Sequence, residues 1–337
     1  MKDVARRAGV GLATVSRVVN GDSRVSEHNR LAVEEAIEEL NFRRNDSARL
    51  LRTGSAASVG LVLDDMADPY FSALSRAVER TAIGRTTVSV AASSENDAVH
   101  GADLIHALCA RRLDGLIVAP PRMLDESLLQ EEIRSGTPMV FVDRAPQTFA
   151  ADAVVSDNHG GAADGVSHLI CRGHRRIACL SDQSELSTVL QRAAAYRAAL
   201  QEVGIEANPR WEHAEGRGGV SSAEWLASLC ALPEDERPTA LFCTNSKASI
   251  TALRVMKEAG LSLGRPGFPA LVCFDDFELA DVIEPGITVV AQDPGEVGRT
   301  AADLLFSRLD GSNEPARTVT VPTRLIVRGS GEVPPPA

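Results

Sequence analysis

Residues 12–20 carry side chains that can bind the surface of a DNA duplex. If the segment is helical, Thr14, Ser16 and Arg17 lie on an outer face. Hydroxyl groups donate hydrogen bonds to phosphate oxygens, and a guanidinium can donate a parallel pair to a guanine edge in the major groove. The residue types of this segment therefore predict a helix that contacts both the backbone and the bases of DNA.

A helix-turn-helix is the element that would position these side chains. Small and branched apolar residues form the predicted inner faces of a short first helix and of the reading helix: Val4, Ala5, Ala8, Val10, Val15 and Val18. Ala5 is small where two helices must cross closely. Gly9 can take the left-handed conformation that turns the chain between them.

A third helix is predicted to follow Ser26, which is a suitable N-cap. Apolar side chains recur at the i, i+3, i+4 and i+7 positions of one face: Val33, Ala36, Ile37 and Leu40. Four glutamates occupy the opposite face. An ordinary three-helix bundle is the alternative, but the Ala–Gly–Val spacing and the polar second helix together favour the DNA reader.

Residues 45–54 predict a helix of only about two turns. Such a helix is unstable alone in water, so we expect it to form only against a partner copy and a DNA groove. Arg49 and Arg52 would supply affinity for phosphate, while Leu50 and Leu51 are apolar residues without an obvious core. A leucine aimed at a base step is the wedge that minor-groove benders use. The alternative is a plain linker, and the position directly after a helix-turn-helix favours a hinge.

The net charge of −11 is divided unevenly along the chain. Residues 1–57 hold 10 Lys and Arg against 8 Asp and Glu, a balance of +2, so the remainder carries −13. The basic bias lies on the segment that is predicted to touch phosphate. The acidic remainder would keep the rest of the protein away from DNA.

Composition favours a cytoplasmic protein without a metal or cofactor. The sequence contains no apolar run of membrane-spanning length, and its first residues lack an apolar secretory region. The six cysteines are scattered without a C-x-x-C pair, which predicts buried, reduced thiols, and the seven histidines lack metal-ligand spacing.

From residue 58 short apolar segments alternate with helical ones. Strands are predicted at 59–63, 88–92, 115–119, 139–142, 177–180, 240–243 and 270–274. Helices are predicted from about residue 71 and at 98–110, 160–171, 191–203, 222–232 and 248–259. This alternation predicts doubly wound parallel sheets with helices on both faces. Because residues 58–337 are too many for one such sheet, we expect two lobes with a cleft between them.

Ligands of open parallel sheets bind beyond the carboxyl ends of the strands. The aromatic, guanidinium, amide and carboxylate groups that follow the predicted strands give a candidate effector site: Tyr70, Phe71, Asp143, Arg192, Asn245 and Asp275. Such a set suits a polyhydroxy ligand, whose apolar face stacks while its hydroxyls make paired hydrogen bonds. The alternative for each polar residue is that it caps the next helix.

The segment DVARRAGVGLATVSRVVNGDSRVSEHNRLAVEEAIEELNF followed by NDSARLLRTG resembles the LacI/GalR family signature. The resemblance continues through SVGLVLDDMADPYF, PMVFVDR and PGITVVAQDPGEVGRTAADLL nearly to the end of the chain. It implies that residues 12, 13 and 17 face bases, that residues 14 and 16 hold phosphates, and that a hinge leucine enters the minor groove. The implied DNA-binding set is Leu12, Ala13, Thr14, Ser16, Arg17, Asn20, Leu51 and Arg52.

The resemblance also implies a domain organisation. An N-terminal helix-turn-helix domain with a hinge helix precedes a two-lobed, periplasmic-binding-protein-like (type I) α/β sensor. The expected bounds are 1–44 for the helix-turn-helix domain, 45–57 for the hinge and linker, and 58–337 for the sensor. Within the sensor, the N-lobe is expected at 58–157 with 291–320, and the C-lobe at 158–290 with 321–331.

The implied function is sequence-specific regulation of transcription, most naturally repression. A homodimer would bind double-stranded DNA at a pseudo-palindromic operator, with its affinity controlled by a small-molecule effector in the cleft. A solute-binding protein of an uptake system shares the two-lobed fold, but it would need a secretory segment and no helix-turn-helix. An enzyme on a doubly wound fold is a further alternative, yet no grouped Ser/His/Asp set or phosphate-cradling glycine loop is present.

Three positions depart from residues that the family commonly has. Leu186 stands where purine sensors have Arg, Arg217 where many sugar sensors have an aromatic residue, and Ser246 where Asp usually follows Asn. The ligand of a relative is therefore not carried over. The extra guanidinium of Arg217 raises the hypothesis of an anionic ligand, such as a sugar phosphate.

Overall fold

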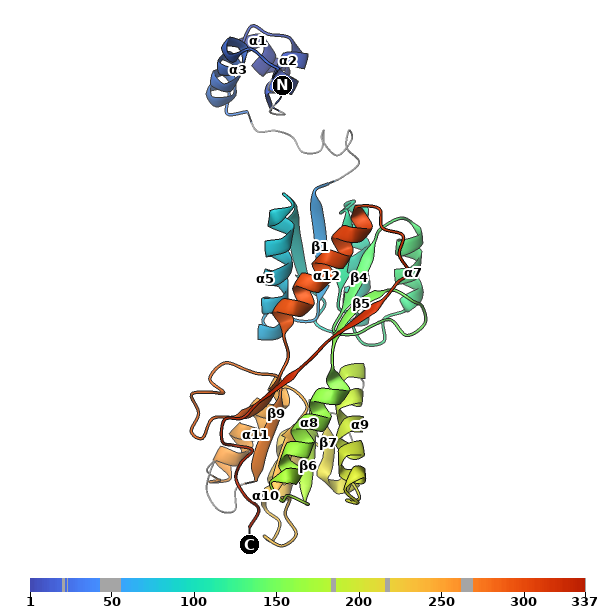
Figure 1. The fold of residues 1–337 in the computed structure, drawn as a ribbon, viewed down its shortest axis with the longest axis vertical. Coiled ribbons are helices and arrows are strands. Elements are labelled where there is room, and N and C mark those ends of the chain that lie inside the picture. The colour runs from blue at the N-terminus through green and yellow to red at the C-terminus, as the bar shows by residue number, and fades with distance from the viewer. Residues whose placement is uncertain are drawn as a thin grey trace. The chain divides into compact units, whose positions relative to one another are not determined.

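The computed structural model describes residues 1–19, 22, 24–42, 56–182, 186–215, 219–261 and 269–336. The chain forms two compact units, residues 1–56 and residues 57–337 (Figure 1). Most of the expected hinge lies outside the described residues. Five residues that were assigned roles from the sequence lie outside them as well: Asn20, Arg49, Leu51, Arg52 and Arg217.

The described residues of the first unit form three helices: α1 (Lys2–Arg7), α2 (Leu12–Val19) and α3 (Glu27–Glu39). Its core consists of five buried side chains: Val4, Ala5, Val15, Val33 and Ala36. Gly9 has φ of +66°, so the left-handed turn predicted between the first two helices is confirmed. Ser26 caps α3 by accepting a hydrogen bond from the backbone N–H of Asn29, as its residue type predicted.

The predicted core face of the third helix needs one correction. Leu40 is 44% exposed, although it continues the apolar spacing of Val33 and Ala36. The reason is that α3 ends at Glu39 and Leu40 is its C-cap. The helical spacing that places Val33 and Ala36 on the inner face therefore does not extend to Leu40. Phe42 packs against the core at this end instead.

The described part of the second unit contains two six-stranded sheets. The sheet of the N-lobe is entirely parallel, in the order β11 (Thr318–Val321), β5 (Asp152–Ser156), β4 (Met139–Val142), β3 (Gly115–Val118), β1 (Ser58–Leu63) and β2 (Val88–Ser93). One face packs against α5 (Pro69–Gly84) and α12 (Pro294–Leu309), and the other against α6 (Ala98–Ala110) and α7 (Glu126–Arg134). Alternate residues of each strand therefore enter different cores.

The sheet of the C-lobe repeats this arrangement. Its order is β12 (Arg324–Ile326), β10 (Thr288–Ala291), β9 (Ala270–Phe274), β8 (Ala240–Cys243), β6 (Ile177–Ser181) and β7 (Glu212–Ala214). The helices α8 (Asn158–Cys171) and α9 (Ser187–Glu202) cover one face, and α10 (Ser222–Cys230) and α11 (Ser246–Glu258) cover the other. Only β12 is antiparallel, against β10. A short 3-10 helix, Pro209–Trp211, leads into β7.

The predicted fold class is confirmed: a helix-turn-helix unit accompanies a two-lobed α/β unit whose sheets are doubly wound. The chain passes between the lobes three times, after β5, after β10 and after β11. The apolar pattern did not predict α7, α12 or several short strands. The start of α12 is an instructive case, because its Pro294 and Gly295 suggest a turn, whereas Asp293 caps the helix and Pro294 occupies its first position.

The cysteines are only partly as predicted. All six are free thiols, and Cys179, Cys243 and Cys273 are buried in the C-lobe sheet. Cys171, however, is exposed because it ends α8 on the surface. None of the helices in the described part of the chain is both long and apolar enough to cross a bilayer.

We expect the substitution Gly298→Ala to destabilise the sensor. A Cβ atom at Gly298 would lie 2.4 Å from the carbonyl oxygen of Leu74 and 3.0 Å from the Cβ of Ala77, because α12 crosses α5 closely there. Overpacking of this kind costs about 1–3 kcal/mol, which thermal unfolding would record as a lower Tm. Gly84→Ala, in the last turn of α5 with open space around it, is the matched control and should leave Tm unchanged or slightly higher. Equal effects of the two substitutions would contradict this account.

Candidate functional site

The outer face of α2 presents the residues that the sequence assigned to base contacts. Leu12, Ala13 and Arg17 are exposed, and Leu12 retains 47% of its surface. Thr14 and Ser16 are half-buried at the edge of this face. Val15 is fully buried and holds the helix on the core, so the exposed face is fixed in direction by packing.

A carboxylate–guanidinium pair stabilises the turn after α2. Asp22 accepts hydrogen bonds from the Nε and Nη2 atoms of Arg24 at 2.9 and 2.8 Å. These bonds, together with one from the Arg24 backbone, lower the pKa of Asp22 to about 2. The backbone N–H of Asp22 also donates to the carbonyl oxygen of Arg17 at 3.0 Å, which ties Asp22 to the end of α2.

A cavity of about 350 Å³ lies between the two lobes of the second unit. Asp68 and Tyr70 line it from the start of α5, and Asp275 lines it from the end of β9. Gln292 joins them from the segment that connects β10 with α12. Its volume is within the range of small-molecule sites. The predicted Tyr70 and Asp275 therefore meet in one cavity, together with side chains that were not predicted.

The two lobes place an aspartate in the same way. Asp143 directly follows β4 and Asp275 directly follows β9, with φ of +66° and +70° respectively. The backbone N–H of Asp143 donates to Val154 on the neighbouring strand, and that of Asp275 donates to Val290. A left-handed backbone is uncommon for residues other than glycine and is often found at functional sites. Both aspartates are thereby turned out of their strands at the edge where the lobes meet.

Arg192 does not line the cavity but is buried beside Asp275, and it is only 4% exposed. Its Nε donates to the side-chain oxygen of Asn158 at 2.8 Å, and its Nη1 donates to the carbonyl oxygen of Thr244 at 2.7 Å. Its guanidinium lies 3.7 Å from the ring centroid of Phe274, and its Nη1 lies 3.8 Å from a carboxylate oxygen of Asp275. Arg192 thus places a buried positive charge beside Asp275, whose carboxylate also accepts a hydrogen bond from Gln292.

The predicted aromatic pair is divided between two environments. Tyr70 lines the cavity, whereas Phe71 is 6% exposed and packs into the N-lobe core. Consecutive residues of a helix differ in direction by about 100°, so only one of the two can face the cleft. Phe71 instead supports Tyr70 through an edge-to-face contact with ring centroids 5.1 Å apart. The expectation that Phe71 contacts an effector is corrected accordingly.

The side chain of Asn245 makes two hydrogen bonds within the protein. Its side-chain oxygen accepts from the backbone N–H of Ala248 and caps α11, while its amide group donates to Asp182 at 2.5 Å. Ser246, next in the chain, lines the cavity, and Leu186 is buried at the start of α9. The helix-cap alternative therefore applies to Asn245, which supports the cavity from its edge.

Several buried carboxyl groups lie near the cleft, beside the positive charges of Arg144, Arg192 and Lys247. Burial raises the pKa of four of these carboxyl groups above their ordinary value: Asp64, Asp68, Asp143 and Asp182. Asp64 and Asp143 also flank the guanidinium of Arg144, which is 6% exposed. Burial likewise raises the pKa of the Tyr70 hydroxyl. Sequence reasoning missed Asp68 and Gln292, although the Asp-Pro pair before a helix is a signal for a capping residue near a strand end.

Known proteins match the chain over almost its whole length. Residues 1–45 match the bacterial regulatory proteins of the lacI family, and residues 166–331 match a periplasmic binding protein-like domain. The HTH-type transcriptional repressor PurR of Photobacterium profundum is 30% identical over 331 residues, which cover 98% of each chain. The chain belongs to the LacI family of bacterial regulatory proteins.

Other relatives of this LacI-family regulator differ in the operon or the bound molecules that their names give. The ribose operon repressor of Haemophilus influenzae is 29% identical over 335 residues, with 98% of each chain covered. A Lac repressor dimer bound to operator and the anti-inducer ONPF has a TM-score of 0.84 at 27% identity, with 98% of each chain covered. The complex of the regulator CelR with cellobiose has a TM-score of 0.71 at 29% identity, again with 98% of each chain covered.

For the reading helix of this LacI-family protein, we expect Arg17→Ala to weaken binding to a duplex selected from a random pool by about 5- to 100-fold. Its side chain is exposed, so the Tm should not change. Fluorescence anisotropy at several salt concentrations would measure affinity and sequence preference. Arg30→Ala on α3, whose guanidinium pairs with Glu34, is the control and should bind as the parent does. Parent-like binding by Arg17→Ala would refute this role of α2.

For the cleft, we expect Asp68→Asn to raise the Tm of the ligand-free protein by about 1–3 °C at pH 8. Burial and the nearby charge of Asp275 raise the pKa of Asp68, so its ionised form is unfavourable in the folded state. The stabilising contribution of a raised acid is present at low pH and is lost as pH rises through its folded pKa. The difference between variant and parent should therefore shrink as the pH is lowered toward 5.

Asn retains the oxygen that caps α5, so the comparison isolates the charge. The matched control is Asp97→Asn, another helix N-cap, which is exposed on α6. This control should leave Tm unchanged at both pH values. Thermal unfolding followed by circular dichroism measures all three proteins, and a lower Tm for Asp68→Asn at pH 8 would refute the argument.

Proposed function

We propose that this protein is a repressor whose affinity for a pseudo-palindromic operator is controlled by a neutral, polyhydroxylated effector bound between its lobes. The main support for the proposal is that one chain contains both features: an exposed face on α2, and a cavity between the lobes that is lined by polar and aromatic side chains. The similarity to a Lac repressor dimer on its operator extends over both parts. On this proposal Leu12, Ala13 and Arg17 contact bases, and Thr14 and Ser16 contact phosphates.

The lining of the cavity supports a neutral ligand rich in hydroxyl groups. Among its described residues are four carboxylates and no Lys or Arg: Asp68, Asp275, Asp276 and Glu278. Carboxylates accept hydrogen bonds, which hydroxyls can donate, whereas an anionic ligand would be repelled. Tyr70 and Phe277 add aromatic surface for the apolar face of a sugar ring. The anionic ligand suggested by Arg217 is therefore the less favoured hypothesis.

Exposed apolar side chains support a homodimer. Val88 and Val90 are 64% and 42% exposed on β2, an edge strand, where soluble proteins ordinarily place charges or bulges. Leu279 and Val282 of the C-lobe are 59% and 71% exposed. We propose that a second copy covers these residues, which would present two reading helices to the two halves of an operator.

Regulation would follow from a difference in effector affinity between two states of the protein. A ligand that bridges the aspartates of both lobes favours one angle between them, and the angle of the lobes would be passed to the hinge segments. Such a protein would act where the bacterial chromosome lies, in the cytoplasm. The solute-binding and enzymatic alternatives are less favoured, because the relatives are named as transcriptional repressors.

The test is effector-dependent binding to a selected duplex, measured by fluorescence anisotropy with neutral pentoses, hexoses and disaccharides and with their phosphorylated counterparts. We expect one neutral sugar to change the affinity for DNA by about 5- to 150-fold, with two chains bound per duplex in analytical ultracentrifugation. Asp275→Asn should keep DNA binding and lose the response. Asp164→Asn, an exposed aspartate on α8, should retain both.

Three results would contradict the proposal. Binding to DNA without sequence preference would refute the role as a sequence-specific regulator. A response confined to phosphorylated sugars would refute the proposal of a neutral effector. A full response in Asp275→Asn would place the effector elsewhere.

A further inference from the structure

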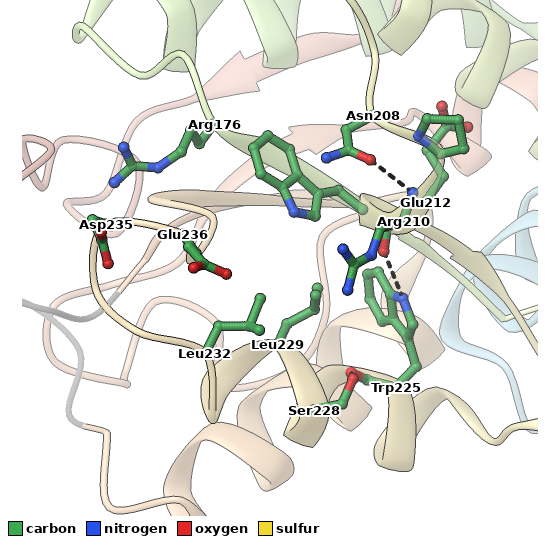
Figure 2. A pocket seen from close by; sticks show the side chains of 12 residues that line it. Arg176, Asn208, Arg210, Glu212, Trp225, Ser228, Leu229, Leu232, Asp235 and Glu236 are labelled. Carbon is green, nitrogen blue, oxygen red and sulfur yellow. Dashed lines mark hydrogen bonds between the residues drawn. The ribbon is translucent and has the colours of Figure 1, made fainter.

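The C-lobe contains a second cavity, of about 670 Å³, that shares no lining residue with the inter-lobe cavity. Arg176 lines it immediately before β6 begins, and Glu212 lines it at the start of the edge strand β7 (Figure 2). The inter-lobe cavity instead uses residues that follow the carboxyl ends of strands. The two cavities therefore lie at opposite ends of the parallel strands of the C-lobe sheet.

Both tryptophans of the chain, Trp211 and Trp225, line this second cavity. The indole N–H of Trp225 donates to the carbonyl oxygen of Arg210 at 3.1 Å. The ring of Trp225 also stacks on His213, with centroids 5.2 Å apart and planes inclined by 16°. These two contacts fix the orientation of a half-exposed ring, so the indole surface that lines the cavity is already positioned for a ligand.

Polar groups of opposite charge stand across the cavity from one another. Figure 2 shows Arg210 on one side and the carboxylates of Asp235 and Glu236 on the other. The backbone of Arg210 is held by Asn208, which accepts its N–H at 3.0 Å, while its guanidinium makes no ion pair with any described residue. Glu212, in contrast, is occupied by two hydrogen bonds from Arg197.

We propose that this cavity is a second small-molecule site, for a neutral hexose or hexose disaccharide. Indole rings present flat apolar surface on which the C–H face of a sugar ring can stack. A hydroxyl group both donates and accepts, so a sugar can bind the guanidinium of Arg210 and the carboxylate of Glu236 at once. Because Glu212 is paired with Arg197, the remaining charges of the lining are the guanidinium groups of Arg176 and Arg210 and the carboxylates of Asp235 and Glu236. These charges balance, which favours a neutral ligand over an ionic one.

Intrinsic tryptophan fluorescence tests the proposal directly, because both tryptophans of the protein lie in this cavity. The full-length protein is titrated with D-glucose, D-galactose, maltose and cellobiose, and with D-glucosamine and D-gluconate as charged probes of similar size. We expect at least one neutral sugar to change the emission saturably, with weaker or absent responses to the charged probes. The response should persist in Asp275→Asn, which disables the inter-lobe cavity, and the readout requires no DNA.

Two substitutions in the cavity should weaken the response about tenfold each, Arg210→Ala and the near-isosteric Glu236→Gln. The control Arg172→Ala removes an exposed arginine at the end of α8 and should bind as the parent does. The proposal is overturned if no neutral sugar gives a saturable change up to 100 mM. It is also overturned if the change disappears in Asp275→Asn, or if both cavity variants respond as the parent does.

Discussion

The guanidinium of Arg192 is the buried charge that ties together three segments of the C-lobe next to the inter-lobe cavity. A charge withdrawn from water must be compensated by hydrogen bonds and counter-charges. Arg192 meets this requirement with Asn158 at the start of α8, the carbonyl oxygen of Thr244 after β8, and Asp275 after β9. Since these partners belong to three separate segments, the compensation of one charge fixes the relative positions of all three.

One acceptor of the cavity, Asp68, is kept at the expense of stability. Burial raises its pKa, although a neutral side chain of similar shape would be tolerated more easily. Binding sites often retain such unfavourable groups because a ligand relieves them. A ligand whose hydroxyls donate to carboxylates on both lobes would stabilise the arrangement that it bridges, which is the energetic basis for the regulation proposed here.

Much of the fold could be predicted because its elements carry local signals. The strands Met139–Val142, Ala240–Cys243 and Ala270–Phe274 and the helix Ala98–Ala110 have the predicted bounds, since continuous apolar runs and regular apolar spacing are properties of the chain itself. The strand Thr318–Val321 was not predicted, because it is short and half polar and becomes a strand only by pairing with β5. The helix Pro294–Leu309 begins with residues typical of a turn, and its cap is recognisable only once the helix is known.

By itself the sequence determined which residues directly follow the strands and which face of α2 is polar, because both can be read from the pattern of apolar residues. Tertiary structure decided what those residues do. Tyr70 lines the cavity while Phe71 enters the core, because helix packing chooses between adjacent directions. Trp211 and Trp225 come together only when β7 and α10 pack at one edge of the sheet. Such convergence depends on contacts between distant segments, which the local pattern of a sequence does not encode.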